Sequence, residues 1–308
     1  RMSNAELFTA AFMPLMGLSM WIESPVIDLL STSTALSRDR ASYNLVRRFT
    51  LWMLLLVALA HAAVALTPLF LFVTEQLIGL PPAVAKAMHI PFIIMIPWSA
   101  MIGWRRHLQG ILIRHSATQA VGWGTTVRMI TLTGVGVGTA LFSGLPGIIC
   151  VALALVTSVA AEAGFVHFAS RRILALHYDH SDSLTDLSIR ALVKFHLPLA
   201  LATIVMFTSG PMVSAAIANL ADPVGNLAAW QVASSMVFMF RTIVFALPEV
   251  VIALAHDEHS KAQLKTFCLR VGAGTMGLLM VFALTGLDRW VFSRLLGASP
   301  EIVKVAHI

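Results

Sequence analysis

Ionisable side chains interrupt several long apolar stretches of this sequence, and their chemistry needs an explanation. In hydrocarbon, a charged group is costly unless it meets a partner or lines a water-filled cavity. Residues of this kind therefore form ion pairs, carry protons or bind charged solutes. The candidates are Glu23, Asp28, Arg128, Glu162, Arg241 and Glu249.

Arg128 and Glu162 lie at similar depths in two consecutive apolar stretches. Arg128 comes nine residues after the start of the stretch 119–143, and Glu162 comes eight before the end of 147–170. Two adjacent antiparallel helices would place these side chains together, so we expect an ion pair. Such pairs are commonly structural, while an arginine at this depth is also a candidate for binding an anionic solute.

The composition identifies the elements that must carry these residues. Of the 308 residues, 58% are hydrophobic and only 12% are charged, and the mean hydropathy is +0.83. Apolar windows of roughly 20 residues match a hydrocarbon layer of ~30 Å, so we predict an all-α polytopic membrane helix bundle. The expected spans are 6–34, 50–73, 88–105, 119–143, 147–170, 188–218, 225–252 and 267–287.

Basic residues predict the orientation of the bundle. When the loops alternate between two sides, one side receives 14 of the 21 Lys and Arg residues, including Arg105 and Arg106. The positive-inside rule makes that side cytoplasmic, so we expect a multi-pass protein of the cell membrane (plasma or inner) with arginine-rich cytoplasmic loops. Residue 1 then lies outside without a signal-peptide pattern, which suggests that an upstream helix is missing.

An internal repeat links the two ends of the chain. Residues 10–90 align without a gap on 228–308, with 21 identities in 81 pairs and an offset of 218. The clearest match sets QLIGLPPAVAKAMHI against RLLGASPEIVKVAHI. The register holds through loops, which favours a duplication over chance similarity between hydrophobic helices.

The repeat predicts two parallel lobes, because an even number of spans separates equivalent points. We expect a first lobe at 1–180 that lacks its first helix and a second at 181–308 that lacks its last three, from an intact protein of twelve spans. Membrane transporters are commonly built from such repeats, with the substrate path between them. The offset also pairs Glu23 with Arg241, so opposite charges would face the central path unless each is satisfied within its own lobe or lines a wet vestibule.

Several function classes find no support in the sequence. Cys150 and Cys268 belong to no metal-binding pattern, and the basic residues cluster at helix ends as in membrane topology rather than nucleic-acid binding. The chain contains no Walker motif, nucleophile elbow or HExxH sequence. We therefore expect a monomeric non-enzyme without a cofactor, apart from H⁺ or Na⁺ as a coupling ion, that contacts the bilayer and a small solute.

Four stretches resemble a known group of transporters. The stretch 188–219, with Pro198-Leu199-Ala200 near its start and Gly210-Pro211 later, resembles the lobe-opening helix of MATE-like transporters in the MOP flippase superfamily. The sequences SPVIDLLSTSTALSRDR (24–40), WRRHLQGILIRHSATQAVGWGTTVRM (104–129) and ALPEVVIALAHD (246–257) are similar to the progressive ankylosis (Ank) family within it. The resemblance implies twelve helices in two lobes, of which this chain would hold the second to ninth and the start of the tenth. It also implies export of small organic anions such as pyrophosphate, citrate or nucleotides.

These observations together predict a secondary-active exporter of a small anionic solute. Arg241, with Arg128, would attract the solute, and Glu23 and Asp28 would carry a coupling proton or compete for the arginine. Glu162 is a further coupling candidate, and Glu249 is either a gate or an interfacial residue. The alternatives are a flippase for a lipid-linked saccharide, cation-coupled multidrug efflux and a scaffold that transports nothing.

Overall fold

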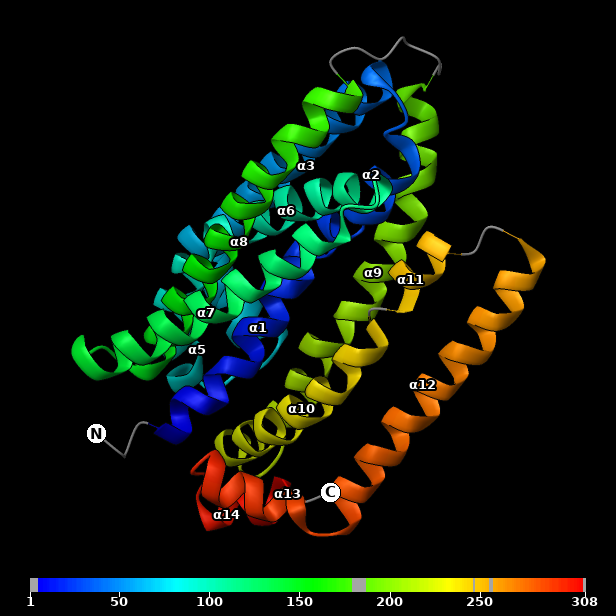
Figure 1. Cartoon of the computed structure of the whole chain (residues 1–308). Coiled ribbons are helices and arrows are strands. Elements are labelled where there is room, and N and C mark those ends of the chain that lie inside the picture. The colour runs from blue at the N-terminus through cyan, green and yellow to red at the C-terminus, as the bar shows by residue number, and fades with distance from the viewer. Residues whose placement is uncertain (1–4, 179–186, 246, 255–256, 307–308) are drawn as a thin grey trace. The chain divides into compact units, whose positions relative to one another are not determined.

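The computed structural model describes residues 5–178, 187–245, 247–254 and 257–306, which form helices and the turns between them (Figure 1). Seven helices are long and apolar enough to cross a membrane. A bent pair of helices, Pro82–Ile94 and Ile96–Arg114, whose axes differ by 49°, is long and apolar enough to form either a broken eighth span or a re-entrant loop. The structure thus confirms the all-α polytopic class, and seven of the eight expected spans correspond to single candidate spans.

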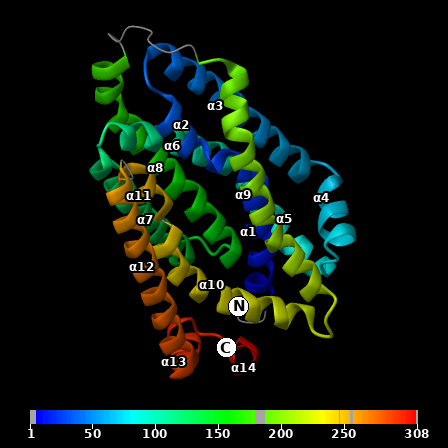
Figure 2. The same cartoon turned by 90° about the vertical axis from the view of Figure 1, so that its right-hand side faces the viewer.

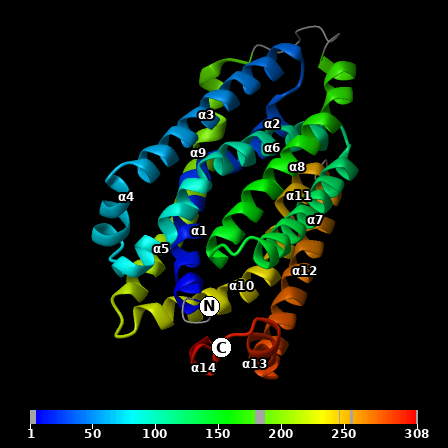
Figure 3. The ribbon, with the colours of Figure 1, turned by 90° about the vertical axis from the view of Figure 1, so that its left-hand side faces the viewer.

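The described residues form two compact units, 1–219 and 220–308. The helices of the first unit are α1 (Ala5–Ile27), α2 (Leu29–Leu36), α3 (Arg40–Leu66), α4 (Leu69–Leu71), a π-helix (Phe72–Leu77), α5 (Pro82–Ile94), α6 (Ile96–Arg114), α7 (Thr118–Phe142), α8 (Gly147–Tyr178) and α9 (Ile189–Ala218). Within this unit, α9 runs along α1 (Figure 2) and α7 runs along α8 (Figure 3). Helix α6 packs against α2, α3 and α8.

The third span differs from its expected range. The sequence predicts a span over 88–105 and a cytoplasmic loop at Arg105 and Arg106; instead α6 continues to Arg114. Arg105 is buried inside the unit, with 6% of its surface exposed. The loop prediction was wrong because a hydropathy window adds up single residues, whereas Arg105 is stabilised by a partner on another helix.

The repeat is visible in the secondary structure of both units. The second unit contains α10 (Pro223–Phe245), α11 (Leu247–Leu254), α12 (Glu258–Leu284), α13 (Leu287–Trp290), a π-helix (Val291–Leu295) and α14 (Pro300–Ala306). An offset of 218 carries the starts of α1, α2, α3, α4 and α5 onto those of α10, α11, α12, α13 and α14. The internal repeat is therefore also a repeat of structure.

Hydrogen bonds at the helix ends recur at the same offset. Asp39 and Ser42 form a capping box at the start of α3, and Asp257 and Ser260 form one at the start of α12. These caps satisfy backbone N–H groups that the first helical turn leaves without partners. Equivalent sequence signals thus set equivalent helix starts in both units.

The boundary between the two units lies after α9, which packs against α1 in the first unit. The predicted lobes divide after residue 180 and assign the same helix to the second lobe. That division follows the correspondence between the duplicated segments, whereas the compact units follow the contacts between helices. The lobe assignment stays a prediction.

Two equivalent glycines turn the chain after the π-helices. Gly79 has φ 77° and Gly297 has φ 64°, in the left-handed region that favours glycine. A Cβ at either position would meet no atom within 4 Å. The requirement for glycine is therefore conformational and does not arise from crowding.

We expect Gly79→Ala and Gly297→Ala each to destabilise the protein by about 1–2 kcal/mol, the cost of a left-handed conformation for an L-residue. Thermal unfolding of the purified protein in detergent measures the effect. Gly122→Ala is the control, because Gly122 lies within α7 with open space around it. Equal melting temperatures for all three variants would contradict this assignment.

A cluster of three rings, His115, His177 and Tyr178, lies where α6 and α8 end. His115 Nε2 lies 2.9 Å from Tyr178 Oη, and the Tyr178 hydroxyl donates to the Ser37 carbonyl at 2.8 Å. The His115 ring stacks on His177 with the ring centroids 4.1 Å apart. Burial, followed by the charges of His177 and Arg114, lowers the pKa of His115 from 6.5 to about 4.

Acid should weaken this cluster. Between pH 6.5 and about 4 the unfolded chain binds a proton at His115 that the folded protein excludes, so the contribution of His115 to stability falls as the pH falls. His115→Gln keeps a donor for Tyr178 but does not titrate. The drop in melting temperature from about pH 7 to about pH 5 should therefore be smaller in this variant than in wild type. His259→Gln, at an exposed histidine of α12, should follow wild type, and equal slopes for His115→Gln and wild type would refute the role.

Candidate functional site

Glu162 lies on a buried face of α8. The side chains of Cys150, Ala154, Ser158, Glu162, Val166 and Ser170 are buried at intervals of four residues. Opposite them on α7 stands Gly124, where a Cβ would lie 3.1 Å from Val166 Cγ2 and 3.5 Å from Glu162 Cγ. Close packing of α7 on α8 therefore depends on glycine beside the carboxylate.

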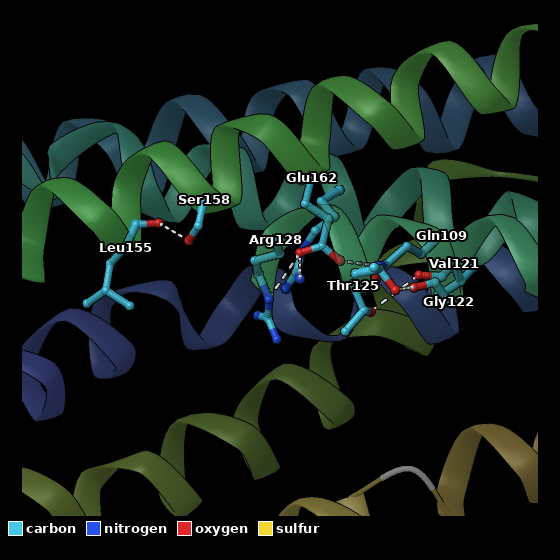
Figure 4. A network of polar contacts seen from close by, with 10 residues as sticks. Gln109, Val121, Gly122, Thr125, Arg128, Leu155, Ser158 and Glu162 are labelled. Atoms are coloured by element: carbon cyan, nitrogen blue, oxygen red, sulfur yellow. Dashed lines mark hydrogen bonds and ion pairs between the residues drawn. The ribbon is translucent and has the colours of Figure 1, made fainter. Parts of the chain in front are cut away.

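Glu162 contacts three polar side chains from two other helices (Figure 4). Arg105 Nη1 of α6 donates to Glu162 Oε2 at 2.5 Å, and Gln109 Nε2, one turn later, donates to Oε1 at 3.2 Å. Arg128 Nε of α7 lies 3.4 Å from the same Oε2. The predicted ion pair between Arg128 and Glu162 is confirmed.

The three charged side chains of this network differ in exposure. The Glu162 side chain is 0% exposed and that of Arg105 is 7% exposed, whereas the side chain of Arg128 is 36% exposed. One carboxylate thus faces two guanidinium groups, which leaves an excess positive charge. Figure 4 shows the end of the Arg128 guanidinium directed away from Glu162, so the exposed cation can still meet an anion.

Sequence reasoning missed Arg105 and Gln109. Both follow a tryptophan in the polar segment WRRHLQ, which reads as the end of a span. Their spacing of four residues was the available signal, because it puts them on the same face of a helix. Only a partner such as Glu162 on α8 identifies that face as buried.

Glu23 lies on α1 and is 3% exposed. Its Oε2 atom has no hydrogen-bond partner among the described residues. The positive charges of Arg105 and Arg106, both on α6, act on this carboxyl group. Two cations of its own unit therefore act on Glu23, which is consistent with the expected alternative of an environment within one lobe. Pairing with Arg241 stays an untested prediction.

Asp28 lies where α1 breaks and α2 begins. Pro25 has no N–H to offer the Trp21 carbonyl, and Ser24 Oγ donates to that carbonyl at 2.6 Å. Helix α9 contacts the break: Thr203 Oγ1 donates to Asp28 Oδ2 at 2.6 Å, and His196 Nε2 lies 2.9 Å from the Pro25 carbonyl oxygen. Asp28 is thus held by a hydroxyl group, and α9 bridges both sides of the break.

The remaining two candidates belong to the second unit. Arg241 is exposed on α10, and Glu249 lies on α11 with its side chain outside the described part. Among the described residues, no group of three or more His, Cys, Asp or Glu side chains is placed to hold a metal ion. The described part of the candidate site is therefore the network of α1, α6, α7 and α8.

One solved structure has the same architecture. It is the inward-facing conformation of a multidrug resistance MATE family transporter of the MOP superfamily, with a TM-score of 0.64. The match covers 98% of this chain and 71% of that chain at 12% identity, so it shows the fold. No family model and no curated protein matches the sequence. The protein therefore has the same fold as this MATE family transporter, and it is a multi-pass membrane protein, as predicted.

Removing the Glu162 carboxylate should destabilise the first unit strongly. Glu162→Ala leaves Arg105 charged and buried without its partner, a change that typically costs about 3–5 kcal/mol. The double variant Arg105→Met/Glu162→Leu removes both buried charges and should recover most of that loss. Unfolding of the purified variants in detergent tests this, and a double variant as unstable as Glu162→Ala would contradict the explanation.

Proposed function

We propose that this protein is a secondary-active transporter, not an enzyme, that exports a small anionic solute by alternating access between two lobes. The observation that supports this most is Arg128, a partly exposed cation whose Nε lies 3.4 Å from a fully buried carboxylate. A guanidinium fixed at one edge still presents its other donors in a planar fork. That fork suits a carboxylate or phosphate group.

The charge of the network argues for an anion. Glu162 neutralises one of its two arginines, and Arg105 takes the shorter contact at 2.5 Å against 3.4 Å for Arg128. The carboxylate therefore offsets the positive charge of Arg128 less than that of Arg105, and Arg128 can attract an anionic solute. Arg241, on the repeat-equivalent position of Glu23, is the proposed second cation.

Coupling is proposed to act through the acids of the first unit. Glu23 is buried and feels the charges of Arg105 and Arg106, and its protonation would increase the positive charge of the network. Asp28 lies at the contact between α9 and the break of α1, where a change of charge would alter helix contacts. H⁺ or Na⁺ binding at these acids would shift the population between inward- and outward-facing states. Glu249 is proposed as a gate residue.

The finer identity of the solute is proposed from the resemblance to the Ank family. It favours pyrophosphate, citrate or a nucleotide, exported across the cell membrane by a monomer with its arginine-rich loops in the cytoplasm. The solved transporter of similar fold, which is 12% identical to this chain, is described as a multidrug resistance transporter. Drug efflux and the flipping of a lipid-linked saccharide are the competing functions, and the transported solute distinguishes them.

Transport in proteoliposomes tests the role of Arg128. We expect Arg128→Ala to lower uptake of labelled pyrophosphate, citrate or nucleotide about tenfold or more, since it removes hydrogen bonds to a charged group. Arg128→Lys should retain part of the activity because it keeps the charge but not the fork. Arg241→Ala is expected to lower uptake in the same assay.

Arg172→Ala, at an exposed arginine of α8, is the matched control and should transport like wild type. Melting temperatures close to wild type would show that the variants are folded. Anion uptake unchanged in both Arg128→Ala and Arg241→Ala would refute the proposal. Transport of cationic drugs or of a lipid-linked saccharide in place of anions would support the corresponding alternative.

A further inference from the structure

A second candidate site lies in the second unit. An open cavity of about 500 Å³ is lined by α13, the π-helix Val291–Leu295, α14 and the turn before it. Its polar lining comes from Arg289, Ser293 and Lys304, and Trp290 adds an aromatic ring. None of the described residues that line it is acidic. The cavity therefore combines two positive charges, a hydroxyl group and a flat apolar surface.

The backbone around the cavity is defined by hydrogen bonds and a glycine turn. Gly297, with φ 64°, reverses the chain after the π-helix, and the Ala298 N–H donates to the Phe292 carbonyl at 2.9 Å. Phe292, Ile302 and Ala306 are buried and anchor the two sides. The cavity is thus built on a defined turn between two anchored helices.

The first unit contains the same turn. Gly79 has a positive φ there, and the Leu80 N–H donates to the Thr74 carbonyl at 2.9 Å, the equivalent of the bond at Ala298. Lys86 is the counterpart of Lys304. The repeat therefore supplies an internal comparison in which the turn of the backbone is shared and the side chains along it differ.

The side chains of the second copy carry more positive charge than their counterparts in the first copy. Leu71 of the first copy is Arg289 in the second, and Glu75 is Ser293. At the equivalent lining positions, the first copy has one acid, Glu75, and one base, Lys86. The second copy has two bases, Arg289 and Lys304, and no acid. This difference at a shared backbone points to an anionic ligand in the second copy alone.

We propose that this cavity binds a phosphate ester, with the phosphate between Arg289 and Lys304 and the organic part against Trp290. Arg and Lys side chains hold phosphate through charge-assisted hydrogen bonds, and Ser293 supplies a further donor. The volume falls within the range of about 300–1,000 Å³ found for small-molecule sites and exceeds the size of a bare phosphate ion. Tryptophan near the end of a span is typical of the membrane interface, so the ester can come from an anionic phospholipid or from a soluble metabolite.

The test exchanges the residues of the two copies. The variant Arg289→Leu/Ser293→Glu gives the second copy the side chains of the first. The reciprocal variant Leu71→Arg/Glu75→Ser gives the first copy those of the second. Because Arg289, Ser293 and Leu71 are exposed and Glu75 is partly exposed, both variants should have melting temperatures close to that of wild type.

Two ligands distinguish the sources of the phosphate. Phosphatidylglycerol retained by the purified protein is counted by native mass spectrometry, with phosphatidylcholine as the reference lipid, and glycerol 1-phosphate is titrated by calorimetry. Arg289→Leu/Ser293→Glu should weaken binding about tenfold, and the reciprocal variant should add a second bound molecule. Lipid binding alone assigns a phospholipid headgroup site, and binding of both ligands assigns a soluble phosphate ester site.

Equal binding of both ligands by wild type and Arg289→Leu/Ser293→Glu, with both proteins folded, would overturn the proposal. The measurement uses binding at the second unit and needs no transport. Its outcome is therefore independent of the role proposed for Arg128.

Discussion

The first unit depends on the contact between Glu162 and two arginines. A carboxylate with 0% exposure in a membrane helix bundle is tolerable only with charged partners, and Arg105 on α6 and Arg128 on α7 provide them. Since Glu162 lies on α8, one carboxylate joins three helices at one depth. Gly124 permits the close packing of α7 that brings Arg128 to Glu162. The ion network and the helix packing therefore require each other.

A second group of contacts joins α9 to α1 and α2 across more than 160 residues of sequence. Thr32 Oγ1 lies 2.9 Å from His196 Nδ1, and Trp21 Nε1 donates to Thr208 Oγ1 at 3.0 Å. Because the Pro25 carbonyl can only accept, His196 carries its hydrogen at Nε2, and Nδ1 then accepts from Thr32. A proton added at Nδ1 would make that nitrogen a donor and force Thr32 to reverse its hydrogen bond. The contact between α9 and the break of α1 is therefore sensitive to the charge of one imidazole.

The parts of the fold that the sequence predicts are those set by local and repeated signals. Spans follow from apolar length, and the offset of 218 fixes where the helices of the second unit begin. The pairing of Arg128 with Glu162 also follows from sequence, because a short turn joins two consecutive spans that then run antiparallel side by side. The burial of Arg105 does not, because its partner lies 57 residues away and its own segment is too polar to read as a span. Contacts of Asp28 with α9 were out of reach for the same reason: periodicity shows which face of a helix is apolar, not which helix covers it.

The repeat separates the scaffold from the chemistry that it carries. Helix starts, capping boxes and the two glycine turns recur, whereas some charged residues have a different counterpart: Glu23 against Arg241, and Glu75 against Ser293. A buried Phe70 of the first unit even corresponds to a buried Asp288 in the second. A backbone that tolerates an apolar side chain in one copy and a carboxylate in the other does not itself dictate that charge. The differences between the copies, rather than their shared positions, are therefore where substrate and ligand chemistry should be sought.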